Sequence, residues 1–209
     1  MNTLQVPKIH IPSINLESLR FAFSDLVWHN IDNTPWVNEY PYIPEVKFQI
    51  AYDSEHIFLH YKVQEEFVKA TYIRANENVW EDSCVEFFIS FDNRQTYYNF
   101  EFNVLGTGLI GYGPAVKSER QRLDPAQIDA VDAFVQLKKI KGKKEWEIGL
   151  VIPKSTFGNV GELEGNTFHA NFYKCGDGLP QPHFIAWNTI DLPKPNFHRP
   201  DFFGEISFI

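Results

Sequence analysis

The chain has only two cysteines, Cys84 and Cys175, and its only methionine is Met1. Two thiols are too few for a disulfide framework or a four-thiolate metal site. A chain of 209 residues can bury a sizeable core without disulfide staples. We therefore expect both cysteines to be free, buried thiols, with a single bridge as the alternative. The lack of other methionines also argues against a haem held by a Met/His pair.

Long apolar runs are absent as well, and the charge balance is acidic. No stretch approaches the roughly 18 consecutive apolar residues of a transmembrane helix. The 27 Asp and Glu outweigh the 19 Lys and Arg, which gives a net charge of −8. An acidic chain with an isoelectric point near 5.3 is a poor partner for nucleic acid or an anionic membrane. We expect neither partner.

A secretory signal is not recognisable in the N-terminal stretch MNTLQVPKIHIPSINLESL. The stretch lacks a basic region, a continuous apolar region and a small-residue cleavage site. The sequence as it stands predicts a cytoplasmic protein. An extracellular or periplasmic location is the alternative if a signal has been removed.

Aromatic residues are abundant, because 19 Phe, 9 Tyr and 5 Trp make up 16% of the chain. Such a composition favours strands over helices. Apolar and polar residues alternate in three pairs of segments joined by short turns, which predicts three hairpins with one buried face each. The paired segments are 46–52 with 57–63, 84–91 with 97–104, and 134–141 with 144–152.

Many short antiparallel strands without a break in composition predict one domain over residues 1–209, with 1–20 as an N-terminal extension. The expected fold class is all-β: an antiparallel β-sandwich, immunoglobulin-like or jelly-roll-like, with few short helices. A short helix is predicted at 153–157 and a turn of another at 125–130. We expect less than about a tenth of the chain to be helical, well below the average of roughly a third.

Carboxylates are the main candidates for chemistry, because the motifs GxSxG and HExxH do not occur. Glu86 and Glu101 fall on the polar faces of two strands that we pair as a hairpin. Two carboxylates about 5–9 Å apart could serve glycoside hydrolysis. The same face carries Asn99 and Asn103, with Trp80 nearby, and this combination suits a sugar, which needs hydrogen-bonding groups and an indole face. A solvated outer face is the third interpretation.

The same region carries a resemblance to a known family. The run VWEDSCVEFFI at 79–89, followed by YYNFEFN at 97–103, is similar to the pattern of carbohydrate-binding module family 9. Supporting similarity lies in WEI at 146–148 with IP at 152–153, in HANFY at 169–173, and in FHRP at 197–200 with FGEI at 203–206. The resemblance covers most of the chain from about residue 20.

Members that this chain resembles are β-sandwiches that bind mono- or disaccharides, typically at reducing ends, between two tryptophans. Matched by position, the resemblance implies that Trp80 and Trp187 clamp the sugar across a slot. It implies Glu86 and Asn103 as polar contacts at the base of that slot and Asn171 as a further contact.

The resemblance also implies a non-catalytic module that supports carbohydrate breakdown. Such modules are often attached to secreted xylanases, so a glycoside hydrolase is the expected partner and a carbohydrate the expected ligand. Structural calcium occurs in the family, although a complete set of oxygen ligands cannot be aligned here, and no other cofactor is required. From the residues alone, a small glycan-active enzyme using Glu86 with Glu101, or a sandwich for protein contacts only, stays an alternative.

Overall fold

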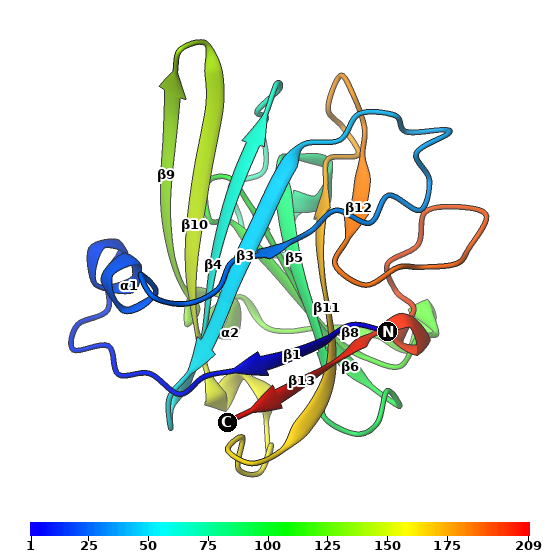
Figure 1. The fold of residues 1–209 in the computed structure, drawn as a ribbon. Coiled ribbons are helices and arrows are strands. Elements are labelled where there is room, and N and C mark those ends of the chain that lie inside the picture. Colours follow the sequence, from blue (N-terminus) through cyan, green and yellow to red (C-terminus); the bar gives the residue numbers. More distant parts are fainter.

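The computed structural model describes residues 1–209 and contains two β-sheets packed face to face (Figure 1). The first sheet has the strand order β1-β13-β11-β5-β6-β7-β8, and β12 pairs with β11. Its strands are β1 Thr3–Val6, β5 Cys84–Ser90, β6 Tyr97–Asn103, β7 Gly108–Gly113, β8 Gln121–Arg122, β11 Thr167–Cys175, β12 Phe184–Ala186 and β13 Gly204–Phe208.

The second sheet has five strands in the order β2-β3-β4-β10-β9. These are β2 His29–Asn30, β3 Glu45–Tyr52, β4 His56–Glu65, β9 Asp132–Ile140 and β10 Lys143–Pro153. All three predicted hairpins are present as antiparallel neighbours, namely β3 with β4, β5 with β6, and β9 with β10. The prediction of an all-β antiparallel sandwich is confirmed.

The inner faces of the two sheets share one aromatic-rich core. Phe172 of β11 stacks on Phe48 of β3 with ring centroids 3.8 Å apart, and on Phe87 of β5 at 5.1 Å. Trp146 of β10 is 0% exposed in the same core. Since side chains alternate along a strand, the other half of each strand faces outward, and the candidate site lies on the outer face of the first sheet.

Helices are few and short, as predicted. The α-helices are α1 Leu16–Ala22 and α2 Pro125–Asp129, and the 3-10 helices are η1 Val79–Glu81, η2 Lys117–Glu119, η3 Lys154–Phe157 and η4 Pro200–Phe202. The short helix predicted at 153–157 corresponds to η3, and the turn predicted at 125–130 corresponds to α2. The sequence patterns did not reveal α1, which Asn15 caps by accepting from the Ser18 amide. Its buried Leu19 packs on the outer face of the second sheet.

The N-terminal segment, expected as an extension over 1–20, contributes one strand to the sandwich. β1 pairs in parallel with β13, and Leu4 and Val6 are buried. Figure 1 shows β1 and β13 side by side, with both chain ends at this edge. The main-chain pairing with a strand more than 190 residues later leaves no signal in the local sequence.

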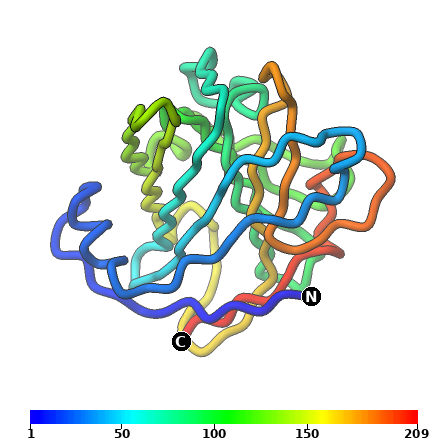
Figure 2. The backbone as a smooth tube through the Cα atoms, turned by 45° about the horizontal axis from the view of Figure 1, so that its top comes forward, coloured from blue at the N-terminus to red at the C-terminus, as the bar shows by residue number.

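Two long connections cover part of the outer face of the first sheet. The segment before β3 and the segment after β12 lie next to each other in both ribbon and tube views (Figures 1 and 2). They are joined where the Trp36 indole donates to the Leu192 carbonyl at 2.8 Å, and where Asn33 bridges to Ala186. The connection after β12 brings Pro195, Asn196, Phe197 and His198 to the rim of one pocket.

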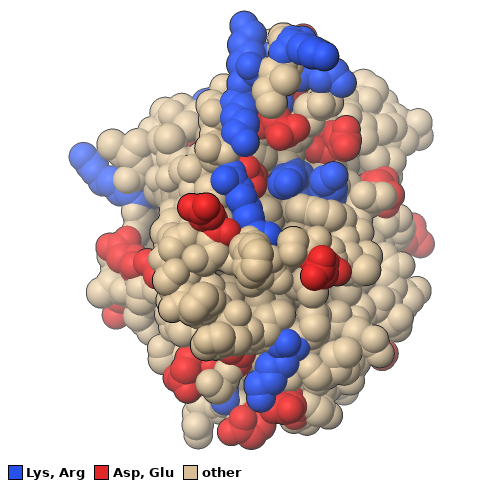
Figure 3. All heavy atoms as spheres, turned by 60° about the vertical axis from the view of Figure 1, so that its left-hand side comes forward, with Lys and Arg blue, Asp and Glu red and all other residues tan.

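The surface carries both signs of charge. Figure 3 shows Lys and Arg gathered at the top of the molecule, where Figure 1 places the turn between β9 and β10. Acidic side chains are spread over the rest of that face. None of the helices is long and apolar enough to cross a membrane.

Candidate functional site

A pocket of about 460 Å³ opens on the outer face of the first sheet. Its floor comes from β5, β6, β7 and the end of β11, and its rim from η1, β8, β12 and the segment 195–198. The lining residues are Trp80, Glu86, Asn99, Glu101, Leu109, Gly111, Lys117, Arg120, Gln121, Arg122, Cys175, Asp177, Phe184, Pro195, Asn196, Phe197 and His198.

Trp80 brings an indole to the rim. It lies on η1, just before β5, and its side chain is half-buried. The carbonyl of Trp80 accepts from the Asp177 amide at 3.1 Å, which ties η1 to the end of β11. The Arg122 guanidinium lies 5.9 Å from the centre of the indole. The ring is thus held in place while one part of it stays available to a ligand.

A second aromatic wall comes from the C-terminal part of the chain. Phe184 of β12 is half-buried, and Phe197 stacks on Tyr173 with ring centroids 4.2 Å apart. His198 contacts the Tyr97 hydroxyl through Nδ1 at 2.8 Å. Burial and the nearby Arg120 lower the pKa of His198 to about 4, so this imidazole is neutral at neutral pH.

Two carboxyl groups form the centre of the floor. Glu86 of β5 and Glu101 of β6 are directly opposite in the register, and each is 4% exposed. One oxygen of Glu101 accepts from Asn99 at 2.8 Å, and one oxygen of Glu86 accepts from the Cys175 thiol at 2.9 Å. The other oxygen of each group makes no hydrogen bond within the chain and is not sealed from solvent. Both are free to meet a ligand.

Burial dominates the acidity of this pair. It raises the pKa of Glu101 to about 7, although Asn99 and the nearby arginines oppose the rise. It raises the pKa of Glu86 well above its ordinary value, with contributions from Cys175 and Glu101. Neighbouring carboxylates in a site with little water favour the protonated form, because each extra negative charge is costly there. The floor therefore offers hydrogen-bond donors as well as acceptors.

Arg120 fixes the side of the floor next to β6. Its guanidinium lies 3.8 Å from the centre of the Tyr97 ring and donates to the carbonyls of Gly113 and Pro114 at 2.7 and 2.9 Å. It also donates to the Asn99 side-chain oxygen. The amide of Asn99 is thereby oriented so that its nitrogen points to Glu101. A side chain at position 111 would collide with Asn99, so Gly111 leaves the space that the Asn99 side chain needs in the floor.

The ionisable side chains form no cluster of three or more oxygen ligands. Cys84, Glu86 and Cys175 are the only group of three or more Cys, His, Asp or Glu side chains with ligand atoms close together, within 4.8 Å of one another. Calcium takes six to eight oxygen ligands, and two of these three atoms are sulfur. The one buried carboxylate oxygen without a hydrogen bond near η1, on Asp82, has the Lys69 ammonium 3.8 Å away instead.

Comparison with known proteins places this fold in a family. The model of the family described as carbohydrate-binding family 9 matches residues 17–208. The chain belongs to carbohydrate-binding family 9. None of the curated proteins compared with it matches.

Solved structures agree with that assignment. A protein from Bacteroides uniformis ATCC 8492, to which carbohydrate binding is ascribed, shares 39% identity over 100% of this chain and 99% of its own, with a TM-score of 0.92. A family 9 module from Caldicellulosiruptor kristjanssonii in complex with cellotriose has 12% identity and a TM-score of 0.64, over 99% of this chain and 93% of its own. The same organism's module in complex with glucose has 12% identity and a TM-score of 0.63, over 100% and 96%. At that identity the likeness concerns the fold.

The structure brings only two of the five expected contacts of this family 9 member to the pocket, Trp80 and Glu86. Trp187 lies in the core between the sheets, 5% exposed, with its ring edge-on to Phe172. The reason is strand parity: Ala186 is opposite Tyr173 on the outer face, so the next side chain points inward. The expected slot between Trp80 and Trp187 is not formed, and Phe184 and Phe197 occupy the second wall.

The two asparagines outside the pocket have structural partners. Asn103 is 0% exposed, donates to Asp82 and the Tyr72 carbonyl, and accepts from the amides of Leu105 and Thr107. It is on the same face as Glu101, as expected, but at the end of β6 that the loop before β5 covers.

Asn171 is also 0% exposed. Its side chain exchanges hydrogen bonds with the main chain of Asn188 in both directions. Asn103 has no hydrogen-bonding position left for a ligand, and both asparagines are buried away from the pocket.

Sequence reasoning missed the arginines and the second aromatic wall. Arg120 and Arg122 were visible only as basic residues after a glycine-rich loop, and Phe197 only as part of the FHRP segment. From the residues alone, Glu101 was a candidate catalytic carboxylate and Asn99 a group suited to a sugar, although the family resemblance implied neither as a contact. Period-two alternation places Asn99 and Glu101 correctly, whereas the arginines and Phe197 reach the pocket through loops that no local pattern positions.

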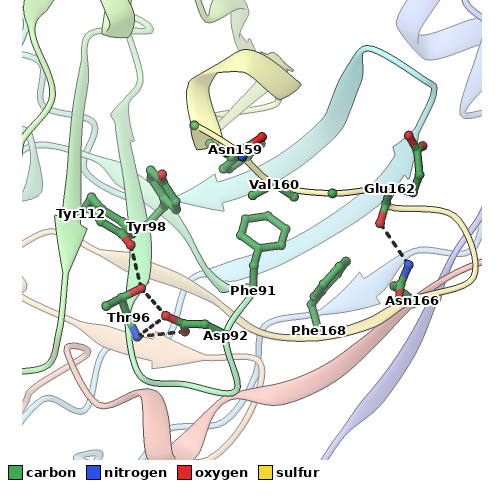
Figure 4. Close-up of a pocket in the computed structure, with 13 residues that line it drawn as sticks. Phe91, Asp92, Thr96, Tyr98, Tyr112, Asn159, Val160, Glu162, Asn166 and Phe168 are labelled. Carbon is green, nitrogen blue, oxygen red and sulfur yellow. Dashed lines mark hydrogen bonds between the residues drawn. The ribbon is translucent and has the colours of Figure 1, made fainter.

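A second pocket, of about 490 Å³, shares no lining residue with the first. Figure 4 shows the rings of Phe91 and Phe168 pointing into its centre. The pocket has two carboxylates: Asp92 accepts from the amide and the hydroxyl of Thr96, and Glu162 is 86% exposed with the Lys154 ammonium 3.8 Å away. The Tyr112 hydroxyl lies 3.0 Å from that of Thr96. This pocket therefore offers aromatic surface but no tryptophan and no buried carboxyl group, and the pocket at Trp80 is the better candidate.

Proposed function

We propose that the chain binds a carbohydrate in the pocket at Trp80, with one sugar ring stacked on the indole. The observation that carries the proposal is a half-exposed tryptophan beside two buried carboxyl groups that each keep one oxygen free. Aromatic faces bind the apolar C–H faces of a pyranose, and carboxyl and guanidinium groups read the directions of its hydroxyls. The family assignment supports the proposal.

Each element of the pocket has a part in this binding. Trp80 and Phe184 supply the apolar surface, Glu101 and Glu86 hydrogen-bond to neighbouring hydroxyls, and Arg122 donates from the rim. The pocket of about 460 Å³ falls within the usual range of roughly 300–1,000 Å³ for small-ligand sites, which is room for a mono- or disaccharide or the end of a glycan chain. Asn103, Asn171 and Trp187 support the fold around it instead of touching the sugar.

Glucose and cellotriose are the first ligands to test, because modules with the same fold have been solved with them. Xylo-oligosaccharides belong in the same panel. Titration followed by tryptophan fluorescence reports stacking on Trp80 directly. We expect weak, saturable binding by the wild type, and a loss of affinity in Trp80→Ala and in Glu101→Gln. Trp28→Ala is the matched control, since Trp28 is a half-buried indole on the outer face of the other sheet, between Lys47 and Lys62.

Recognition of a chain end can be tested with the same assay. Borohydride reduction opens the terminal ring of cellotriose and leaves the other two rings unchanged. If the pocket holds the reducing end, the reduced sugar binds much more weakly than cellotriose. Such a module would hold a chain end for a glycoside hydrolase during carbohydrate breakdown. Equal binding of both sugars would exclude the reducing-end interpretation while leaving sugar binding intact.

Hydrolysis by Glu86 and Glu101 is the second candidate, favoured by their direct cross-strand pairing inside the pocket. Retaining and inverting mechanisms both need one protonated and one ionised carboxyl group. Here burial raises the pKa of both, so neither is a well-ionised partner at neutral pH, and binding is the better-supported function. Release of the chromophore from aryl glycosides by the wild type, lost in Glu101→Gln, would reverse this order.

A further inference from the structure

Two thiols and a carboxyl group meet under the floor of the pocket. Cys84 and Cys175 are directly opposite each other on β5 and β11, and Glu86 follows two residues along β5 on the same face. The sulfur of Cys175 lies 2.9 Å from one oxygen of Glu86, and the three ligand atoms are all within 4.8 Å of one another. Both cysteines are free and buried. Sugar binding, as argued above, requires neither thiol.

We propose that Cys84, Cys175 and Glu86 form a binding site for a thiophilic divalent cation of the zinc class, with a fourth coordination position open to the pocket. Zinc binds thiolate sulfur at about 2.3 Å and carboxylate oxygen at about 2.0–2.2 Å in tetrahedral geometry. Those bond lengths place the ligand atoms about 3.5–3.8 Å apart. Ligand atoms that already lie within 4.8 Å need to close by about 1 Å at most, and the Cys175 sulfur and the Glu86 oxygen, 2.9 Å apart, need to open by about 0.6 Å.

The position of the cluster provides an entry path and an open site. Cys175 and Glu86 line the pocket, whereas Cys84 lies behind them and is 0% exposed. A cation that enters through the pocket meets two ligands first and the third at the back. Three protein ligands leave one position for water or for a hydroxyl of a bound molecule, which is the arrangement of open zinc sites.

The loaded site keeps one negative charge. Two thiolates and one carboxylate carry three negative charges, so one remains after a divalent ion has bound. The fully buried ammonium of Lys174 donates to the Cys175 carbonyl at 2.7 Å, but it is already paired with the Glu65 carboxylate at 3.0 Å. Without metal the cluster keeps its protons, because burial raises the pKa of Cys84 to about 11 and that of Glu86 well above its ordinary value. Metal binding therefore releases protons.

The test uses the reduced, full-length protein with cobalt and zinc ions alone. Cobalt at a site with two thiolates gives thiolate-to-cobalt charge-transfer absorption and the visible bands of tetrahedral geometry. We expect one equivalent to saturate both signals, zinc to displace the cobalt, and titration in buffers of different ionisation enthalpy to show two to three protons released per ion. We also expect bound zinc to slow alkylation of both thiols at least tenfold.

Variants separate this site from simple attraction to the acidic pocket. Cys84→Ser, Cys175→Ser and Glu86→Gln should each weaken cobalt binding at least tenfold and change its spectrum. Glu101→Gln removes the other carboxyl group of the floor, keeps all three ligands, and should retain the cobalt spectrum. If a cysteine variant fails to fold, the spectrum and the thiol protection of the wild type still decide the matter.

Two outcomes would overturn the proposal. One is a reduced wild type without cobalt–thiolate absorption or thiol protection at millimolar metal. The other is a freshly purified protein that contains a Cys84–Cys175 disulfide and binds no metal after reduction. Sugar titration with a chelator present keeps the two hypotheses apart, since sugar binding at Trp80 that survives metal removal shows that either can fail alone.

Discussion

The two tryptophans that the family resemblance pairs should respond to alanine substitution in opposite ways. Trp80 is half-buried at the pocket rim, whereas Trp187 is 5% exposed between the sheets. We expect Trp80→Ala to weaken sugar binding with little loss of stability. We expect Trp187→Ala to destabilise the fold while the folded fraction binds sugar with unchanged affinity.

The structure sets both magnitudes. An indole buries about 150–250 Å² in full, and stacking adds about 0.5–1.5 kcal/mol. A sugar that covers roughly a third of that area gains another 1–2 kcal/mol at about 25 cal/mol per Å². Removing Trp80 therefore costs about 1.5–3 kcal/mol of binding free energy, or roughly ten- to hundredfold in affinity.

Trp187 contributes to unfolding free energy instead. Its ring is edge-on to Phe48 and Phe172, and Gly204 is kept free of a side chain because a Cβ there would lie 2.6 Å from the indole. Replacing a buried tryptophan with alanine typically costs about 3–5 kcal/mol because of lost burial and the cavity left behind.

Urea unfolding and sugar titration, both on each variant, separate the two effects. The titration of Trp187→Ala is performed at a temperature where the variant is folded, as shown by its near-ultraviolet circular dichroism. Trp80→Ala binding as tightly as the wild type, together with a folded Trp187→Ala that has lost binding, would refute the assignment of the site to the Trp80 pocket.

Three further predictions concern stability. Asn103→Ala should lower the unfolding free energy by about 2–4 kcal/mol in urea unfolding, because it strands the amides of Leu105 and Thr107; a loss below 0.5 kcal/mol would contradict this. Lys174→Met should lower the unfolding free energy by about 3–5 kcal/mol, because the buried Glu65 carboxylate loses the ammonium that lies 3.0 Å from it. Adding Glu65→Gln should restore part of that loss. Burial lowers the pKa of His183 from 6.5 to about 3 in the folded protein, so below pH 6.5 the unfolded chain binds one proton more than the folded chain. The free energy of unfolding should therefore fall by up to about 1.4 kcal/mol per pH unit between pH 6.5 and the folded pKa. His183→Gln should show a shallower fall between pH 6 and 4 in the same assay, and an unchanged slope would exclude His183 as its source.

The hairpins were predictable because each depends on residues close together in the chain. Phe100 and Phe102 alternate with Asn99 and Glu101, and the alternation alone separates the inner face from the outer face of β6. The turn before it is also local, since the Asp92 carboxylate accepts from the amide and hydroxyl of Thr96. Short-range signals of this kind survive in any single sequence.

Other elements depend on partners that the sequence does not reveal. α1 has seven residues, too few for a stable isolated helix, and forms because Leu19 packs on the second sheet. β1 exists only through pairing with β13 at the other end of the chain. The inward direction of Trp187 follows from the register of β12 on β11, which places Ala186 opposite Tyr173.

By itself the sequence determined an all-β sandwich with few helices and the outer-face position of Glu86 and Glu101. Alternation with a period of two is a local property, so it is readable without a structure. The tertiary structure alone decided which side chains share the pocket. Arg120, Phe184 and Phe197 reach it from separate segments, whereas Asn103 and Asn171 make hydrogen bonds within the fold. The two thiols meet because β5 and β11 are neighbours. Those outcomes depend on strand register and loop packing, which are set by contacts between residues far apart in the chain.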